Sequence, residues 1–125
     1  MEVIGTDEFT AWYEALPEPS AEAVTRAVNV LERLGAEQEH VTPVKLYPRL
    51  GMPAAGLRLF ELAVQGSSLR VLFALEEVER AVLLYGYDVD TELRVGALRQ
   101  MPATAHALLA ANVYRLYRAG KPGAA

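Results

Sequence analysis

The sequence predicts an α+β domain in which a helical hairpin packs on an antiparallel β-meander and a last helix closes the fold. Three observations predict it. Apolar residues recur at helical spacing up to Gly35, they alternate with strand periodicity from Leu57 to Tyr87, and helical spacing returns after Pro102. The chain has 125 residues, of which 52% are hydrophobic. We therefore expect a single domain over residues 1–125, with residues 120–125 as a frayed tail.

The N-terminal part predicts two antiparallel helices. The first ends before Pro17, and the second is expected to begin after an N-cap at Ser20 and to end at Gly35. The first helix has an apolar stripe of Phe9, Trp12, Tyr13 and Leu16. The second has a stripe of Val24, Ala27, Val28, Leu31 and Leu34. Glutamates on the outer faces of both helices indicate that these faces meet solvent.

Three strands follow, joined by the turns "QGSS" and "EEVE". Alternation places Glu61 on one face of the first strand and Arg58 on the other. In the second strand, it places Arg70 on the face opposite the larger group of apolar side chains. The third strand, from Arg80 to Tyr87, is apolar on both faces, so we expect it to be well covered. Before the first strand, "VKLYPRL" is expected to pair briefly with a sheet edge, where proline is tolerated.

The last helix is expected to open near Pro102 and to end at Gly120. Its expected inward stripe contains Ala105, Leu108, Leu109, Asn112, Val113 and Leu116. This assignment places His106 on the polar face of the helix, where we expect it to be exposed to solvent. An acid–base role for His106 is the less favoured interpretation.

Charge is distributed unevenly along the chain. The formal net charge is −4, but residues 1–90 carry seven basic and fifteen acidic side chains, whereas residues 91–125 carry five basic side chains against Glu92. Residues 91–125 would attract a polyanion, whereas residues 1–90 would repel it. Arg115, Arg118 and Lys121 can also simply complement the dipole of the last helix.

Several classes of protein are excluded. The chain has no cysteine and its two histidines are far apart, so neither a disulfide framework nor a metal site is expected. No glycine-rich phosphate loop is present, and we expect no cofactor. The N-terminus does not read as a signal peptide, and no apolar run is long enough to span a bilayer. We therefore expect a cytoplasmic protein with no membrane partner.

Four stretches occur in a recognisable order: "LFELA", "RVLFA", "LLYGYDVD" and "MPATAHALLAANVYRLY". Upstream, "FTAWYEALP" and "VNVLERLG" fit a helical hairpin, and "VKLYPRL" fits a basic segment before the first strand. With these motifs, nearly the whole chain resembles the RelE/HigB toxin superfamily, and specifically its phage-derived Gp49-like branch. The resemblance implies a RelE-like fold.

The resemblance also implies a function. Such a protein would be the toxin of a type II toxin–antitoxin system, a metal-independent endoribonuclease that cleaves mRNA on the ribosome and is silenced by a cognate helix-turn-helix antitoxin. Arg70 and Glu61 stand at the family's catalytic positions. Lys45 and Arg49, in the basic segment, are candidates for RNA binding.

The sequence departs from the family pattern at three positions. Ala63 replaces an arginine, and Val89 and Asp90 replace a pair of lysines. If the loop before Pro102 folds back, Arg94 and Arg99 could supply the missing cations to the RNA site.

These departures leave alternatives open. Glu61 and Arg70 could form a cross-strand ion pair with no catalytic role. The whole protein could be a catalytically degenerate toxin fold that serves as a protein-binding module, which the sequence pI near 5.2 favours. A gyrase-directed toxin of the related ParE group is a more distant alternative.

Overall fold

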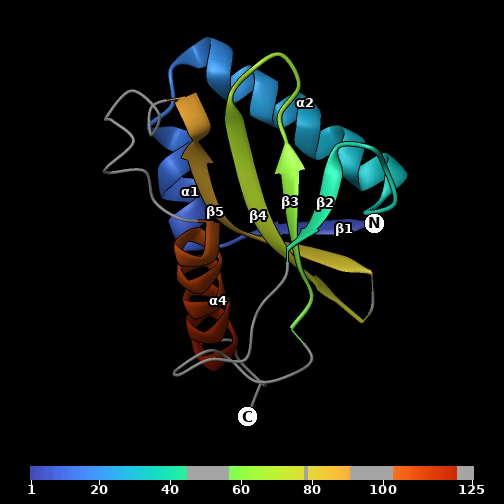
Figure 1. Ribbon diagram of the computed structural model, residues 1–125, viewed down its shortest axis with the longest axis vertical. Coiled ribbons are helices and arrows are strands. Elements are labelled where there is room, and N and C mark those ends of the chain that lie inside the picture. Colours follow the sequence, from blue (N-terminus) through green and yellow to red (C-terminus); the bar gives the residue numbers. More distant parts are fainter. Residues whose placement is uncertain (45–56, 78, 91–102, 121–125) are drawn as a thin grey trace.

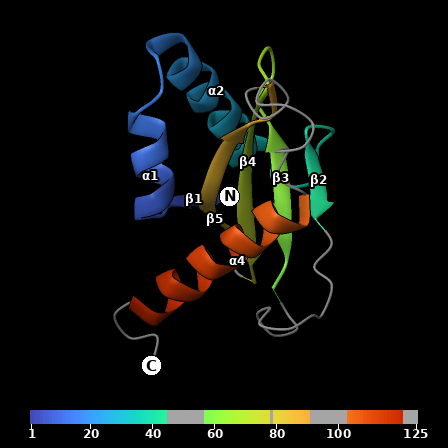
Figure 2. The same ribbon diagram turned by 60° about the vertical axis from the view of Figure 1, so that its left-hand side comes forward.

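The computed structural model describes residues 1–44, 57–77, 79–90 and 103–120. It shows one β-sheet with helices on both faces, which confirms the predicted α+β fold. Helices α1 (Asp7–Glu14) and α2 (Glu18–Leu34) cover one face, and α4 (Ala103–Gly120) covers the other. Figure 1 shows the sheet between α2 and α4, and Figure 2 shows α4 crossing in front of the strands. Within the described part of the chain, no helix has the length and hydropathy needed to cross a bilayer.

The sheet has five strands in the order β1-β5-β4-β3-β2. The predicted meander is β3 (Leu59–Ala63), β4 (Leu69–Glu76) and β5 (Arg80–Asp88), and each strand pairs antiparallel with the next. The edge strand β2 (Val41–Val44) pairs with β3 and carries a proline, as an edge strand can. The edge pairing thus lies slightly earlier than expected, and the rest of "VKLYPRL" falls outside the described residues.

A fifth strand at the N-terminus was not predicted. β1 (Glu2–Gly5) pairs with β5 in parallel, so the sheet is mixed rather than purely antiparallel. Arg80 Nε donates to Glu2 Oε2 at 3.2 Å across this pair. The pairing places β5 inside the sheet, and this explains why β5 is apolar on both faces. A four-residue strand is too short to show a period, so periodicity does not predict it.

Thr6 joins β1 to α1. Its hydroxyl donates to the carbonyl of Leu83 at 2.8 Å and accepts from the backbone N–H of Phe9 at 3.2 Å, which caps the helix. Trp12, one turn further on, lies against the backbone of Gly86: a Cβ at that glycine would come within 2.3 Å of the indole ring. The glycine of "LLYGY" is therefore needed so that α1 can approach β5 closely.

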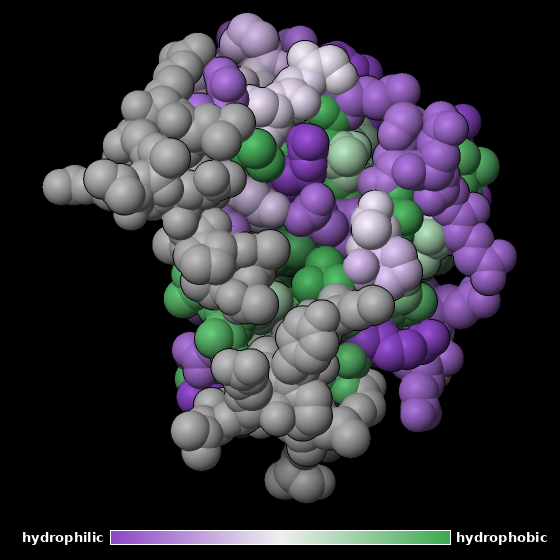
Figure 3. Space-filling model, in the orientation of Figure 1, coloured by the Kyte–Doolittle hydropathy of each residue, from purple (hydrophilic) through white to green (hydrophobic). Residues whose placement is uncertain are grey.

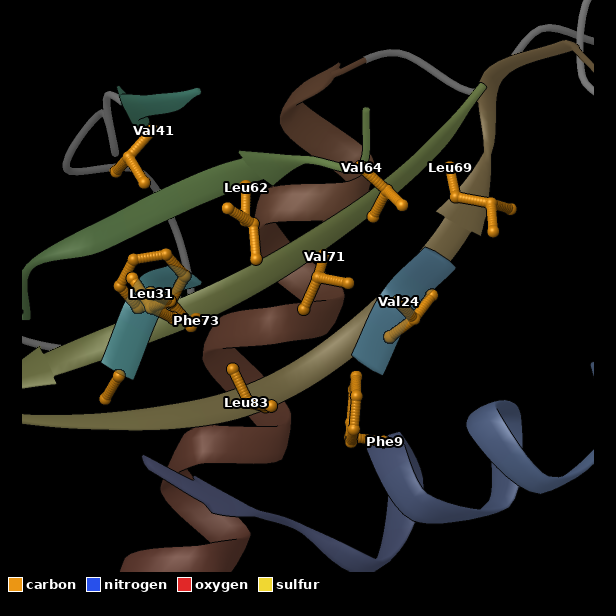
Figure 4. Packing of buried hydrophobic residues seen from close by; sticks show 11 residues of the cluster. Phe9, Val24, Leu31, Val41, Leu62, Val64, Leu69, Val71, Phe73 and Leu83 are labelled. Atoms are coloured by element: carbon orange, nitrogen blue, oxygen red, sulfur yellow. The ribbon is translucent and has the colours of Figure 1, made fainter. Parts of the chain in front are cut away.

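The core under the helical hairpin is made of large apolar side chains from both layers (Figure 4). Fully buried members include Val24, Leu31, Leu62, Val71 and Phe73. Gly35 ends α2 with φ of +75°, as its predicted C-cap role requires. Two expectations for α2 are wrong. The helix starts at Glu18 with Pro19 in its first turn, so Ser20 is not its N-cap, and Leu34 is 61% exposed.

Helix α4 is turned away from the expected orientation. The residues that face the sheet are mainly small: Ala107, Ala110 and Ala111 are buried, and tyrosines flank them. Three leucines predicted to point inward are instead 42% to 48% exposed, namely Leu108, Leu109 and Leu116. The strands below already present bulky side chains, so small residues allow the helix to lie close to the sheet.

Candidate functional site

Polar side chains gather on the face of the sheet that α4 covers. The register places Arg70 on β4 directly between Ala63 on β3 and Tyr87 on β5. Glu61 lies opposite Leu72, so it is the diagonal neighbour of Arg70. Because side chains alternate along a strand, Glu61, Arg70 and Tyr87 project from the same face. The helical hairpin packs on the opposite face.

Glu61 is held by two partners. One carboxylate oxygen, Oε1, lies 3.6 Å from Nε of Arg70, and the other, Oε2, accepts a hydrogen bond of 2.7 Å from the hydroxyl of Tyr87. Arg70 also donates from Nη1 to the carbonyl of Leu69 at 3.0 Å. The side chains of Arg70 and Glu61 remain 28% and 29% exposed, so a ligand from solvent can reach both. The sequence predicted that these two residues share a face, and the structure brings them together.

His106 joins this group, contrary to the expectation that it is exposed. It is 3% exposed, and its ring stacks on Tyr87 with 3.8 Å between centroids and an angle of 14° between planes. It also lies 5.6 Å from the ring of Tyr85. The correction follows from the rotation of α4, which turns the histidine toward the sheet. Tyr87 was overlooked at the sequence level, although alternation along β5 could have placed it beside Arg70.

A second polar cluster fastens the other end of α4. Glu76, at the end of β4, accepts a hydrogen bond of 2.6 Å from Tyr114 and lies 3.3 Å from Nη1 of Arg118 and 3.5 Å from Nη1 of Arg80. Burial, followed by the hydrogen bond to Glu76, raises the pKa of Tyr114 to about 12. This cluster lies away from Arg70 along β4 and anchors the helix.

Val89 and Asp90 occupy the two positions at which the family resemblance leads one to expect lysines, so the end of β5 carries carboxylates in place of cations. Asp88, at the end of β5, accepts hydrogen bonds from Ser68 Oγ at 2.5 Å and from the backbone N–H of Asp90 at 2.9 Å. Ala63, directly opposite Arg70, provides no cation. The four predicted RNA-binding residues, Lys45, Arg49, Arg94 and Arg99, lie outside the described residues. No group of three or more metal-ligating side chains occurs among the residues that are described.

Comparisons with known proteins extend this description at the level of the fold. No protein-family model matches the chain, and no curated protein sequence matches it. Among solved structures, the chain is similar to one in the crystal structure of the archaeal RelE–RelB complex from Pyrococcus horikoshii. The TM-score is 0.53 and the identity is 13%, over 70% of this chain and 92% of that chain. The protein therefore has a RelE-like fold.

Proposed function

We propose that this protein is the toxin of a type II toxin–antitoxin pair and that it cleaves mRNA on the ribosome without a metal ion. The observation that carries the proposal is the accessible pair of Arg70 and Glu61, 3.6 Å apart on one face of a RelE-like sheet. A helix-turn-helix antitoxin is the proposed partner, and the cytoplasm is the proposed location. The Gp49-like branch is the proposed affiliation within the superfamily.

The proposed reaction uses the two charged side chains in different roles. Glu61 accepts the proton of a ribose 2′-hydroxyl, whose oxygen attacks the adjacent phosphorus. The bond from phosphorus to the 5′-oxygen breaks, and that oxygen takes a proton from water. The hydroxide that remains takes the proton from Glu61, which restores the carboxylate. The products are a 2′,3′-cyclic phosphate and a 5′-hydroxyl. Arg70 stabilises the negative charge that builds on the phosphoryl oxygens.

Tyr87 acts in this scheme as a positioning residue. Its hydroxyl holds Oε2 of Glu61 at 2.7 Å, which orients Oε1 toward Arg70. The stacked ring of His106 in turn limits the rotation of Tyr87. A phosphate that enters the site would compete with Glu61 for the guanidinium of Arg70 and free Oε1 to act as a base.

Induced expression tests the proposal. The wild-type protein should arrest growth and cut translated messages, and Arg70→Ala should abolish both, because loss of one preorganised charge contact typically lowers the rate by roughly 10²–10³. Arg58→Ala is the matched control, since Arg58 is exposed just before β3, beside residues from the end of α2. Circular dichroism should show the same fold for all three proteins. Equal toxicity of both variants would contradict the assigned role of Arg70.

A second candidate function is a catalytically degenerate binding module that still contacts an antitoxin-like partner. It is favoured by the alanine opposite Arg70 and by the carboxylates at the end of β5. The wild-type result separates the two candidates, because a degenerate module should neither arrest growth nor cut messages at high expression. Arg94→Ala and Arg99→Ala should weaken an active enzyme in part, if the proposed RNA contacts exist.

A further inference from the structure

The outward side of α4 is an apolar surface. We define the outer α4 face as Leu108, Leu109, Asn112 and Leu116, whose spacing places them on one side of the helix. The three leucines are 42%, 42% and 48% exposed. In the space-filling view of Figure 3, hydrophobic atoms appear next to hydrophilic ones on the left, where α4 runs in Figure 1. The region of α2 is mainly hydrophilic in the same view.

These leucines do not serve the protein's own core. The contact between α4 and the sheet is already filled by Ala107, Ala110 and the tyrosines of the helix. Large apolar side chains gathered on one exposed face mark an interaction site more often than scattered ones do. The spacing of Leu109 and Leu116 is the one with which amphipathic helices pack on each other.

Charge around the face indicates the kind of partner. α4 contains no acidic residue, and Arg115 borders the leucines. The guanidinium of Arg115 donates from Nη2 to Oδ1 of Asn112 at 2.9 Å, which holds the positive charge beside the outer α4 face. Arg118 does not add to this charge, because it pairs with Glu76 at 3.3 Å on the other side of the helix. A second copy of this helix would bring like charges together, whereas an acidic partner would neutralise them.

We propose that the outer α4 face binds an amphipathic helix whose apolar stripe is flanked by acidic residues. This inference rests on the proposed function, in which that helix belongs to the antitoxin. Leu108 and Leu116 are separated by about 12 Å along the helix axis, so two to three turns of a partner helix cover the face. α4 stays on the sheet during binding, because the cluster around Glu76 and the alanine contact lie on its other side.

The experiment uses the full chain co-expressed with the protein encoded by the reading frame beside its gene, followed by titration calorimetry on the separated components. Leu108→Glu with Leu116→Glu should weaken binding at least 100-fold. Arg115→Glu should weaken it about tenfold and reduce its dependence on salt. Leu34→Glu is the matched control: this leucine is also exposed, but it lies at the end of α2 beside Glu37. Its binding should equal that of the wild type.

Four outcomes would overturn the inference. If the outer-face variants bind like the wild type, the docking surface lies elsewhere. The proposal of an antitoxin partner is unaffected by that result. If sedimentation shows that the chain alone dimerises and that the leucine variants do not, the occupant is a second copy. If no complex forms, or if hydrogen exchange shows that binding releases α4 from the sheet, the surface is wrong. Growth arrest, measured on the toxin alone, tests the proposed function independently of these four outcomes.

Discussion

The two long helices of this protein use their apolar stripes in opposite ways. In α2, the stripe faces the sheet, and Val24 and Leu31 are completely buried. In α4, the leucines face solvent and the alanines face the sheet. Both stripes have helical spacing in the sequence, so the period alone identifies a one-sided helix without saying what covers that side. The surface of the neighbouring strands decides which side is buried.

The largest effect should come from the core under α2. Phe73 is fully buried and stacks on Phe60 at 5.6 Å, so Phe73→Ala should lower the free energy of unfolding by about 3–5 kcal/mol. Urea denaturation measures this change. A loss well under 1 kcal/mol would mean that this core can collapse around the cavity.

An effect of intermediate size should come from the alanine contact under α4. Ala110 is fully buried, and Ala110→Leu adds volume where the helix lies close to the sheet. Overpacking of this kind typically costs about 1–3 kcal/mol. Denaturation should show the loss, and hydrogen exchange should show weaker protection in α4 than in α2. Ala119→Leu, at an exposed position of the same helix, is the control.

A smaller effect should come from Tyr114→Phe, which removes one hydrogen bond to Glu76 and should cost about 0.5–1.5 kcal/mol at neutral pH. The effect should depend on pH. The pKa of Tyr114 is raised from 10.0 to about 12, so the folded state favours the protonated phenol. Its stabilising contribution is present below pH 10 and is lost as the pH rises toward 12. Denaturation curves between pH 9 and pH 12 should therefore converge for the wild type and the variant.

The smallest effect should come from the outer α4 face. Leu116→Ser replaces a leucine that is 48% exposed, so the free energy of unfolding of the isolated chain should change by less than about 0.5 kcal/mol. A melting curve measures it. A loss comparable to that of Phe73→Ala would show that part of the chain covers this leucine, and the contrast between the two helices would then fail.

Much of the fold was predictable from the sequence because its signals are local. Alternation located β3, β4 and β5 and placed Glu61 and Arg70 on one face, as the structure confirms. The parallel strand β1 was not predictable, since four residues carry no period and its partner lies far along the chain. The rotation of α4 was not predictable from periodicity, because the larger apolar side chains of this helix lie on its exposed side. His106 was misplaced for the same reason.

The parallel pairing of β1 with β5 bears on how the protein is made. β1 is synthesised well before its partner, because it pairs with residues 80–83, and the hydroxyl of Thr6 donates to the carbonyl of Leu83. Until that part of the chain has been synthesised, β1 lacks its neighbour and α1 lacks the backbone of Gly86 against which Trp12 packs. Contacts between residues this far apart in sequence form late and slow folding. The sheet, and with it the face that carries Arg70, is therefore completed only after residues 80–86 have emerged.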